Sequence, residues 1–101
     1  MARILIGEPD DEVRRLLTFV VARLGHEPVE SHEADVYLFE PESPAWLELA
    51  QRLRRERPGL AIVALSINPP CAETRELAPV CHLMKPFVRS ELAAALELAS
   101  Q

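Results

Sequence analysis

The chain has 101 residues, of which 49% are hydrophobic and 27% are charged, and its formal net charge at pH 7 is -5. This length fits one domain with a single hydrophobic core, and the hydrophobic content is too high for an intrinsically disordered chain. The negative net charge disfavours a surface that binds nucleic acid or an anionic membrane, and no apolar run approaches the roughly 18 residues of a membrane-spanning helix.

The N-terminal residues lead directly into a predicted strand rather than into a signal peptide. The cysteines, Cys71 and Cys81, are too few for a disulfide scaffold. We therefore expect a cytoplasmic protein in which residues 1–101 form a single domain with free thiols.

The first predicted elements are a strand, a turn and an amphipathic helix. Residues 3–7 predict a short strand, and a turn follows because Pro9 favours extended geometry at its predecessor and Asp10 can cap a helix. From Asp11 the apolar residues recur at helical spacing as far as Gly25, which suits a left-handed helix end. The expected buried stripe of this helix is Val13, Leu16, Leu17, Val20 and Leu24.

Residues 26–34 have room for one weak strand around Val29 but not for a helix that would carry the chain back across a sheet. Residues 35–40, Asp-Val-Tyr-Leu-Phe-Glu, then form an apolar run that ends in a carboxylate before Pro41. Such a run predicts a central parallel strand covered on both faces. Because ligands of open parallel sheets bind beyond the carboxyl ends of the strands, Glu40 is the first candidate site residue.

The second half of the chain continues this alternation. Ser43-Pro44 predicts the start of a helix that ends before Pro58 and has Trp46, Leu49, Ala50 and Leu53 on its apolar side. The following segments predict a buried strand at 60–65 that closes on Ser66, at most a short helix at 71–78, a strand at 80–84, a turn at 85–87, and a final helix that buries Leu92, Ala95, Leu96 and Ala99. Strands that alternate with helices predict an α/β fold with a parallel sheet.

Polar side chains follow several of the predicted strands. Glu8 and Asp10 follow the first strand, Glu40 the third, Ser66 the fourth and Lys85 the last. Carboxylates are ligands that Mg²⁺ prefers, whereas a hydroxyl and a lysine bind phosphate oxygens. Because the carboxyl ends of parallel strands share one edge of the sheet, this set fits a site for phosphoryl and magnesium chemistry.

The order of these elements resembles the receiver domain of response regulators, the phospho-acceptor module of two-component signalling. The matching segments are residues 3–17, Gly25-His26-Glu27, the acceptor strand at 35–40, the strand 63–66 that ends in the switch Ser or Thr, and the Lys-Pro-Phe signature in Met84-Lys85-Pro86-Phe87. The resemblance covers the whole chain. It implies a flavodoxin-like, doubly wound parallel sheet of four to five strands with a cis peptide bond at Lys85-Pro86. The family's second helix is missing from this chain.

Three positions differ from the family's pattern. The acceptor aspartate is Glu40 here, the metal-binding acidic pair is Glu8-Pro9, and the aromatic switch position is His82. Because Mg²⁺ demands near-ideal octahedral geometry, the loss of a carboxylate at Pro9 predicts weak magnesium binding, with Glu8, Asp10 and Glu40 as a weak alternative ligand set. The longer side chain of Glu40 should reach toward Lys85 and Ser66, and an ion pair with Lys85 would hold a phosphate-independent state.

These departures predict an atypical stand-alone receiver, or pseudo-receiver. It would be no enzyme, would need no cofactor, and would bind a protein partner without conventional aspartate phosphorylation. The partner would be a sensor kinase or a regulatory protein docked on the face of the last strand and last helix, or a second copy of the chain. The degenerate acceptor site would comprise Glu8, Asp10, Glu40, Ser66 and Lys85.

Two alternatives stay open at this point. The first is a phosphorylation-competent receiver that takes a phosphoryl group from a histidine kinase with Mg²⁺, in which Glu40 or Asp10 replaces the missing groups. The second is a salt bridge between Glu40 and Lys85 that fills the site without any signalling role. A nucleotide-binding α/β domain is disfavoured because no glycine-rich loop follows the first strand.

The missing helix predicts one further feature. In the family's strand order, second-first-third-fourth-fifth, the chain must cross the first strand on its way from the second strand to the third. We expect an edge strand or irregular loop at residues 29–31 and an extended return through His32 and Glu33. One face of the first and third strands would then lie bare, and such an apolar patch predicts self-association or partner docking.

Overall fold

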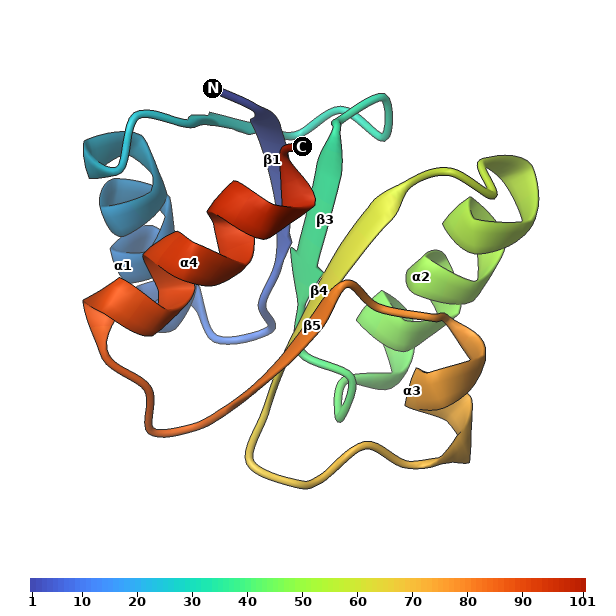
Figure 1. The fold of residues 1–101 in the computed structure, drawn as a ribbon. Helices are drawn as coiled ribbons and strands as arrows, with labels where there is room; N and C mark the ends of the chain where they lie inside the picture. The colour runs from blue at the N-terminus through green and yellow to red at the C-terminus, as the bar shows by residue number, and fades with distance from the viewer.

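The computed structural model describes all 101 residues, which form one five-stranded parallel sheet and four helices. The elements in chain order are β1 (Arg3–Gly7), α1 (Asp11–Arg23), β2 (Glu27–Val29), β3 (Val36–Phe39), α2 (Pro44–Glu56), β4 (Ala61–Ser66), α3 (Ala72–Glu76), β5 (Cys81–Met84) and α4 (Arg89–Ala99). The strand order is β2-β1-β3-β4-β5 (Figure 1). The predicted flavodoxin-like fold is confirmed, and no helix lies between β2 and β3.

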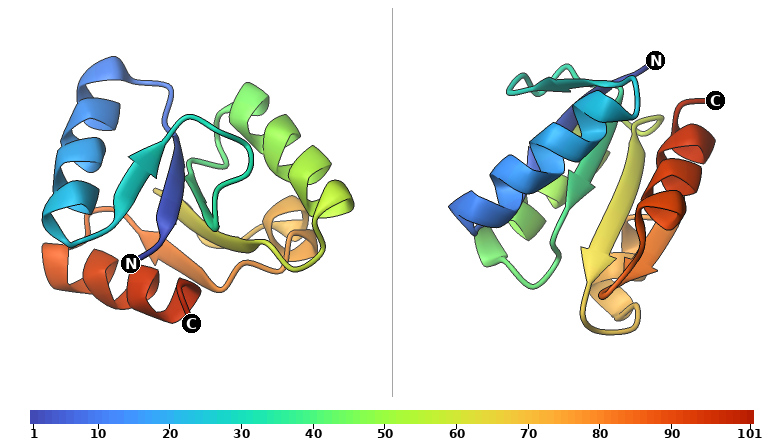
Figure 2. Two further views of the ribbon diagram at one scale, coloured as in Figure 1. Left: turned by 90° about the horizontal axis from the view of Figure 1, so that it is seen from above. Right: turned by 90° about the vertical axis from the view of Figure 1, so that its left-hand side faces the viewer.

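Helices cover both faces of the sheet, with α1 and α4 on one face and α2 and α3 on the other (Figure 2). Successive residues of a strand point to opposite faces. In β1, Ile4 and Ile6 belong to the core beneath α1 and α4, whereas Leu5 belongs to the core beneath α2. All four residues of β3 are buried, so β3 is the doubly covered central strand that its sequence predicts.

The helices bury the predicted residues to different extents. In α4 the predicted stripe of Leu92, Ala95, Leu96 and Ala99 is buried. In α2 only Ala50 and Leu53 are buried, and Trp46 and Leu49 are half-buried.

The predicted stripe of α1 is too wide. Leu17 and Val21 are the buried residues of this helix, whereas Val13 is 37% exposed and Leu16 is 62% exposed. The reason is that α1 packs over β1 and the edge strand β2, so only a narrow side of the helix meets the core. Gly25 has a φ of 91°, which confirms the left-handed residue predicted after this helix.

The segment that joins β2 to β3 differs from the prediction in its details. The edge strand spans Glu27–Val29 rather than 29–31. The return is a turn, not an extended segment, because the Ala34 amide donates to the Ser31 carbonyl at 3.3 Å. The guanidinium of Arg57 donates to the His32 carbonyl at 2.8 Å, and Ala34 is buried in the core beneath α2, so the return segment packs against that face.

The expected bare sheet face does not form. Leu5 is only 6% exposed, and Tyr37 and Phe39 are 0% and 1% exposed. The two rings are stacked with centroids 4.9 Å apart, and the Tyr37 hydroxyl donates to the Trp46 carbonyl in α2 at 2.9 Å. The first turns of α2 therefore cover the surface that the missing helix was expected to expose, and self-association through a bare sheet face loses its basis.

The edge strand β2 is also poorly suited to pairing with a second chain. The Glu27 amide donates to the Ala2 carbonyl at 2.9 Å, so the backbone N–H and C=O of Glu27 point toward β1. Because these groups alternate along a strand, the backbone of the next residue, Pro28, points away from the sheet. Proline has no N–H to offer at that outer position, which is a common way to protect an edge. No helix of the protein is both long and apolar enough to cross a membrane.

Candidate functional site

The candidate site lies at the carboxyl ends of β1, β3, β4 and β5. The strands are parallel and in register, with Gly7 beside Phe39, Phe39 beside Ala64, and Ser66 beside Met84. Two backbone hydrogen bonds extend this alignment past the strand ends, from the Glu40 amide to the Gly7 carbonyl at 3.0 Å and from the Lys85 amide to the Ser66 carbonyl at 2.7 Å. Residues that directly follow these strands are therefore brought to one edge of the sheet.

Lys85 lies between two carboxylates. Its Nζ is 3.4 Å from Glu40 Oε1 and 3.5 Å from Glu8 Oε1. The side chain of Glu8 is only 5% exposed, and those of Glu40 and Lys85 are 18% and 24% exposed. The contact predicted between Glu40 and Lys85 is present, and the three side chains form a largely desolvated cluster with two acidic groups and one basic group, hereafter the lysine cluster.

The pKa of Glu40 is raised above its ordinary value. Burial is the largest cause, and the nearby Glu8 carboxylate raises the pKa further, while the positive charge of Lys85 acts in the opposite direction. One ammonium group therefore does not fully compensate two carboxylates in this setting.

Ser66 is fully buried at the end of β4, but its partner is Glu42 and not Glu40. Its hydroxyl donates to Glu42 Oε2 at 2.5 Å and accepts from the Asn68 amide at 2.9 Å. Site residues were expected directly at the strand ends, so Glu42, which lies in the loop beyond Pro41, was missed. The available signal was a second carboxylate in the loop between Glu40 and the helix start at Ser43-Pro44.

Asp10 does not join the lysine cluster, which corrects the predicted site. Its carboxylate caps α1 and accepts from the amides of Glu12 and Val13 at 2.9 and 3.1 Å. A carboxylate is a favoured cap because it satisfies amides that have no partner within the helix. No three His, Cys, Asp or Glu side chains are arranged to hold a metal ion, so the alternative ligand set of Glu8, Asp10 and Glu40 is not assembled.

His82 lies in β5, where the sequence placed the aromatic switch position. Its Nε2 is 2.8 Å from the Asn68 carbonyl, and because a carbonyl only accepts, Nε2 carries the proton. Its Nδ1 is buried without a hydrogen-bond partner. His82 thus ties β5 to the loop after β4, and Asn68 contacts both His82 and Ser66. The predicted cis peptide bond between Lys85 and Pro86 is present.

Comparison with known proteins gives structural matches only. No protein-family model matches the sequence, and no curated protein matches it. A response regulator receiver domain protein from Clostridium thermocellum is similar with a TM-score of 0.83 and 16% identity, over 99% of this chain and 94% of that chain. A CheY-like receiver domain protein from Methanospirillum hungatei has a TM-score of 0.80 and 17% identity, over 96% and 91% of the two chains.

A third solved structure comes from a different setting. A putative pilus assembly protein from Burkholderia thailandensis has a TM-score of 0.80 and 20% identity, and the match covers 100% of both chains. The strand order and these similarities agree along nearly the entire chain. The protein therefore has the fold of a response-regulator receiver domain, with Glu8, Glu40, Ser66 and Lys85 at the carboxyl ends of its strands.

Proposed function

We propose that this protein is an atypical receiver that binds a protein partner without aspartate phosphorylation. The observation that carries the proposal is the pairing of Lys85 with both Glu8 and Glu40. A phosphoryl group arriving at this edge would meet a lysine whose charge is already compensated and two carboxylates that repel it. The resting cluster thus resembles a site that is already filled by its own side chains.

The hydroxyl at the site supports the same proposal. In the receiver resemblance Ser66 would donate to a phosphoryl oxygen, but here it donates to the Glu42 carboxylate at 2.5 Å. A phosphoryl group would have to displace this charge-assisted hydrogen bond as well as the ion pair at Lys85. Both groups suited to phosphate binding already have carboxylate partners within the chain.

Magnesium binding is proposed to be weak for a related reason. Mg²⁺ is usually held by one or two carboxylates in strict octahedral geometry. The Glu8 and Glu40 carboxylates that meet here share Lys85, which a divalent cation would have to displace, while Asp10 is committed to the cap of α1.

The partner surface is proposed to lie on β5 and α4. This region carries exposed apolar side chains at Met84, Val88 and Leu98, which are 43%, 60% and 49% exposed. Apolar side chains at the rim of a signalling fold are suited to a protein partner, because their burial on association is favourable. In this proposal the lysine cluster holds the β5 end of that surface in one state without a phosphoryl group.

The experiment is incubation with acetyl phosphate and Mg²⁺ followed by intact-mass measurement. We expect no mass increase of one phosphoryl group in the natural chain, and no saturable magnesium effect on Trp46 fluorescence at low millimolar concentration. The double variant Pro9→Asp/Glu40→Asp, which supplies the family's acidic pair and acceptor, is the matched comparison. Incorporation into the natural chain would instead support a phosphorylation-competent receiver, for which the retained Lys85 and Ser66 are the favourable features.

A further inference from the structure

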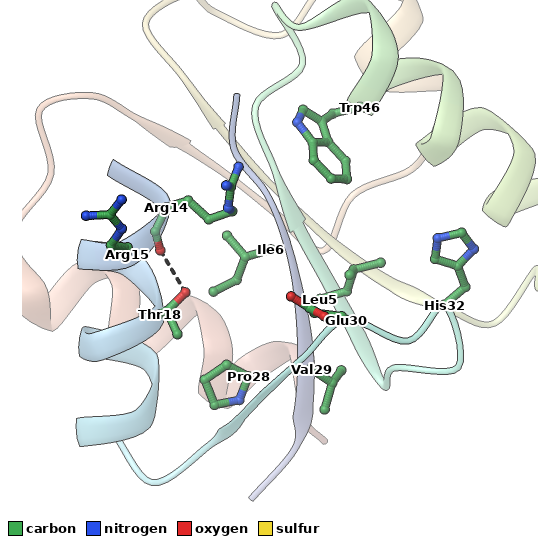
Figure 3. A pocket seen from close by; sticks show the side chains of 10 residues that line it. All are labelled: Leu5, Ile6, Arg14, Arg15, Thr18, Pro28, Val29, Glu30, His32 and Trp46. Atoms are coloured by element: carbon green, nitrogen blue, oxygen red, sulfur yellow. Dashed lines mark hydrogen bonds between the residues drawn. The ribbon is translucent and has the colours of Figure 1, made fainter. Parts of the chain in front are cut away.

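A cleft of about 670 Å³ opens beside the carboxyl-terminal half of β1. It exists because β2 pairs only with Arg3–Leu5, and because the chain turns back after Val29 without a helix. The outer edge of β1 at Ile6 therefore has no neighbouring strand, and it lies between α1 on one side and the start of α2 on the other. In Figure 3 Ile6 lies on the α1 side of β1 and Leu5 on the other side, and together with Val29 they form the floor between α1 and Trp46.

The cleft has an apolar floor, an aromatic side at Trp46 and a cationic side at α1. Leu5, Ile6, Val29 and the Trp46 indole supply the apolar surface, while α1 contributes Arg14, Arg15 and Thr18 (Figure 3). Arg14 is committed, since its guanidinium donates to the Glu8 carbonyl at 2.9 Å and pairs with Asp11 at 2.5 Å. The Arg15 side chain makes no ion pair or hydrogen bond within the protein, and the residue is exposed.

The side chains around the cleft carry a net positive charge, whereas the whole chain is negative. A smaller hollow of about 380 Å³ shares Trp46 and His32 with the cleft. Arg14 is neutralised by Asp11, so the charged residues that remain around the two hollows are Arg15, Arg52 and Arg55, against Glu30 and Glu48. The region is thus basic on a chain with a formal net charge of -5. A positive region with a low-dielectric wall favours anionic ligands.

We propose that this cleft binds a small organic molecule with a flat aromatic body and one anionic group. The aromatic body would lie on the Trp46 indole and the apolar floor, and the anion would pair with the Arg15 guanidinium. The cleft volume lies within the range of about 300–1,000 Å³ that is usual for small-molecule sites. Stacking on an indole and a charge-assisted hydrogen bond to an arginine are together a common way to fix such a ligand. The cleft and the lysine cluster use different side chains, so phosphorylation of the chain would leave this inference intact.

The test uses two fluorescent probes that differ by one charge. Anilinonaphthalene sulfonate is an anion with a flat naphthalene body, and phenylnaphthylamine has the same rings without the sulfonate. The chain has 1 tryptophan, Trp46, so energy transfer from tryptophan reports that a probe is bound, and the variants locate it. We expect the sulfonate to bind about tenfold more tightly than the neutral probe, the size of one charge-assisted contact.

Variants decide where the probe lies and what holds it. Arg15→Gln should weaken the sulfonate about tenfold and leave the neutral probe unchanged, because it removes one charge-assisted contact. The matched control is Arg89→Gln on α4, an exposed arginine outside the cleft, which should change neither probe. Thr18→Phe should weaken both probes by filling the cleft, with circular dichroism as the check of folding.

Several outcomes would overturn the proposal. No transfer from Trp46 to the sulfonate would do so, as would equal sulfonate affinity in the natural chain and in Arg15→Gln. Loss of the signal in Phe19→Ser would place the probe on the outer side of α1, where Phe19 and Leu16 are each 62% exposed, and would also contradict the cleft as the site.

Discussion

The lysine cluster lies at the carboxyl end of β1 and the cleft lies beside its outer edge, and the two regions differ in whether their charged side chains have partners. In the cluster, Lys85 is paired with Glu8 and Glu40, and all three side chains are at least three-quarters buried, with exposures of 24%, 5% and 18%. In the cleft, Arg15 is exposed and has no partner. The first region is closed by its own side chains, and the second still has a cation to offer to a ligand.

The comparison shows why a charged residue by itself does not mark a binding site. Lys85 would be read from the sequence as a phosphate-binding cation, yet its neighbours compensate its charge inside the fold. The two regions also adjoin through Arg14, whose side chain lines the cleft while its guanidinium donates to the Glu8 carbonyl at 2.9 Å.

The largest expected effect is on stability, and it tests whether the charges of the two regions differ in their partners. Lys85→Met should lower the free energy of unfolding by about 3 kcal/mol at neutral pH, because it leaves two buried carboxylates without their cation. Arg15→Met, the same change in the cleft, should alter it by no more than about 0.5 kcal/mol. Urea denaturation of both variants is the measurement. Equal changes in the free energy of unfolding would mean that Lys85 compensates its neighbouring carboxylates no more than Arg15 compensates any group in the cleft.

A second substitution tests the packing around Trp46, which lines the cleft. A Cβ added at Gly7 would lie 2.7 Å from Tyr37 Oη and 3.0 Å from Trp46 Cε3, so Gly7→Ala must displace the hydroxyl and the indole. We expect a loss of about 1.5 kcal/mol from overpacking and a shift of the Trp46 emission. Gly59→Ala is the control, because nothing lies within 4 Å of its added Cβ. Unchanged emission in Gly7→Ala would show that the Trp46 side of the cleft is loosely packed.

The smallest effect concerns the pH dependence of the lysine cluster. The pKa of Glu40 is raised from 4.5 by burial, so the folded state binds this proton more tightly than the unfolded state. Its contribution to stability is fully present below pH 4.5 and is lost as the pH rises through the raised pKa. The natural chain should therefore show a stability loss in this window that Glu40→Gln lacks.

Asp35 provides a control of opposite sign for that experiment. The Arg3 amide donates to its carboxylate at 2.9 Å and holds its pKa below the ordinary 3.8. The stabilisation from Asp35 is thus present above pH 3.8 and is lost as the pH falls through the lowered pKa. Denaturation midpoints measured across pH for Glu40→Gln and Asp35→Asn should diverge from the natural chain in opposite directions, and parallel curves would contradict the assignment for Glu40.

Much of the fold could be predicted from local patterns. The apolar run that becomes β3, the stripe of Leu92 and Leu96 in α4, and the interval too short for a helix before β3 all follow from spacing and composition. These features depend on residues close in sequence, whose periodicity directly reports which side is buried. The convergence of Glu8, Glu40 and Lys85 also followed, because parallel strands bring their carboxyl ends to one edge.

Other features depended on contacts between distant elements. The pairing of Ser66 with Glu42, the cover that α2 provides over Tyr37 and Phe39, and the cleft between α1 and Trp46 were not visible in the sequence. Each is set by the exact placement of one helix or loop against the sheet, to within the length of a hydrogen bond. Sequence patterns therefore determined which residues form strands and helices and which edge of the sheet carries the polar groups. Only the tertiary packing decided which charges are compensated, because charge compensation acts over a few ångströms between groups that are far apart in the chain.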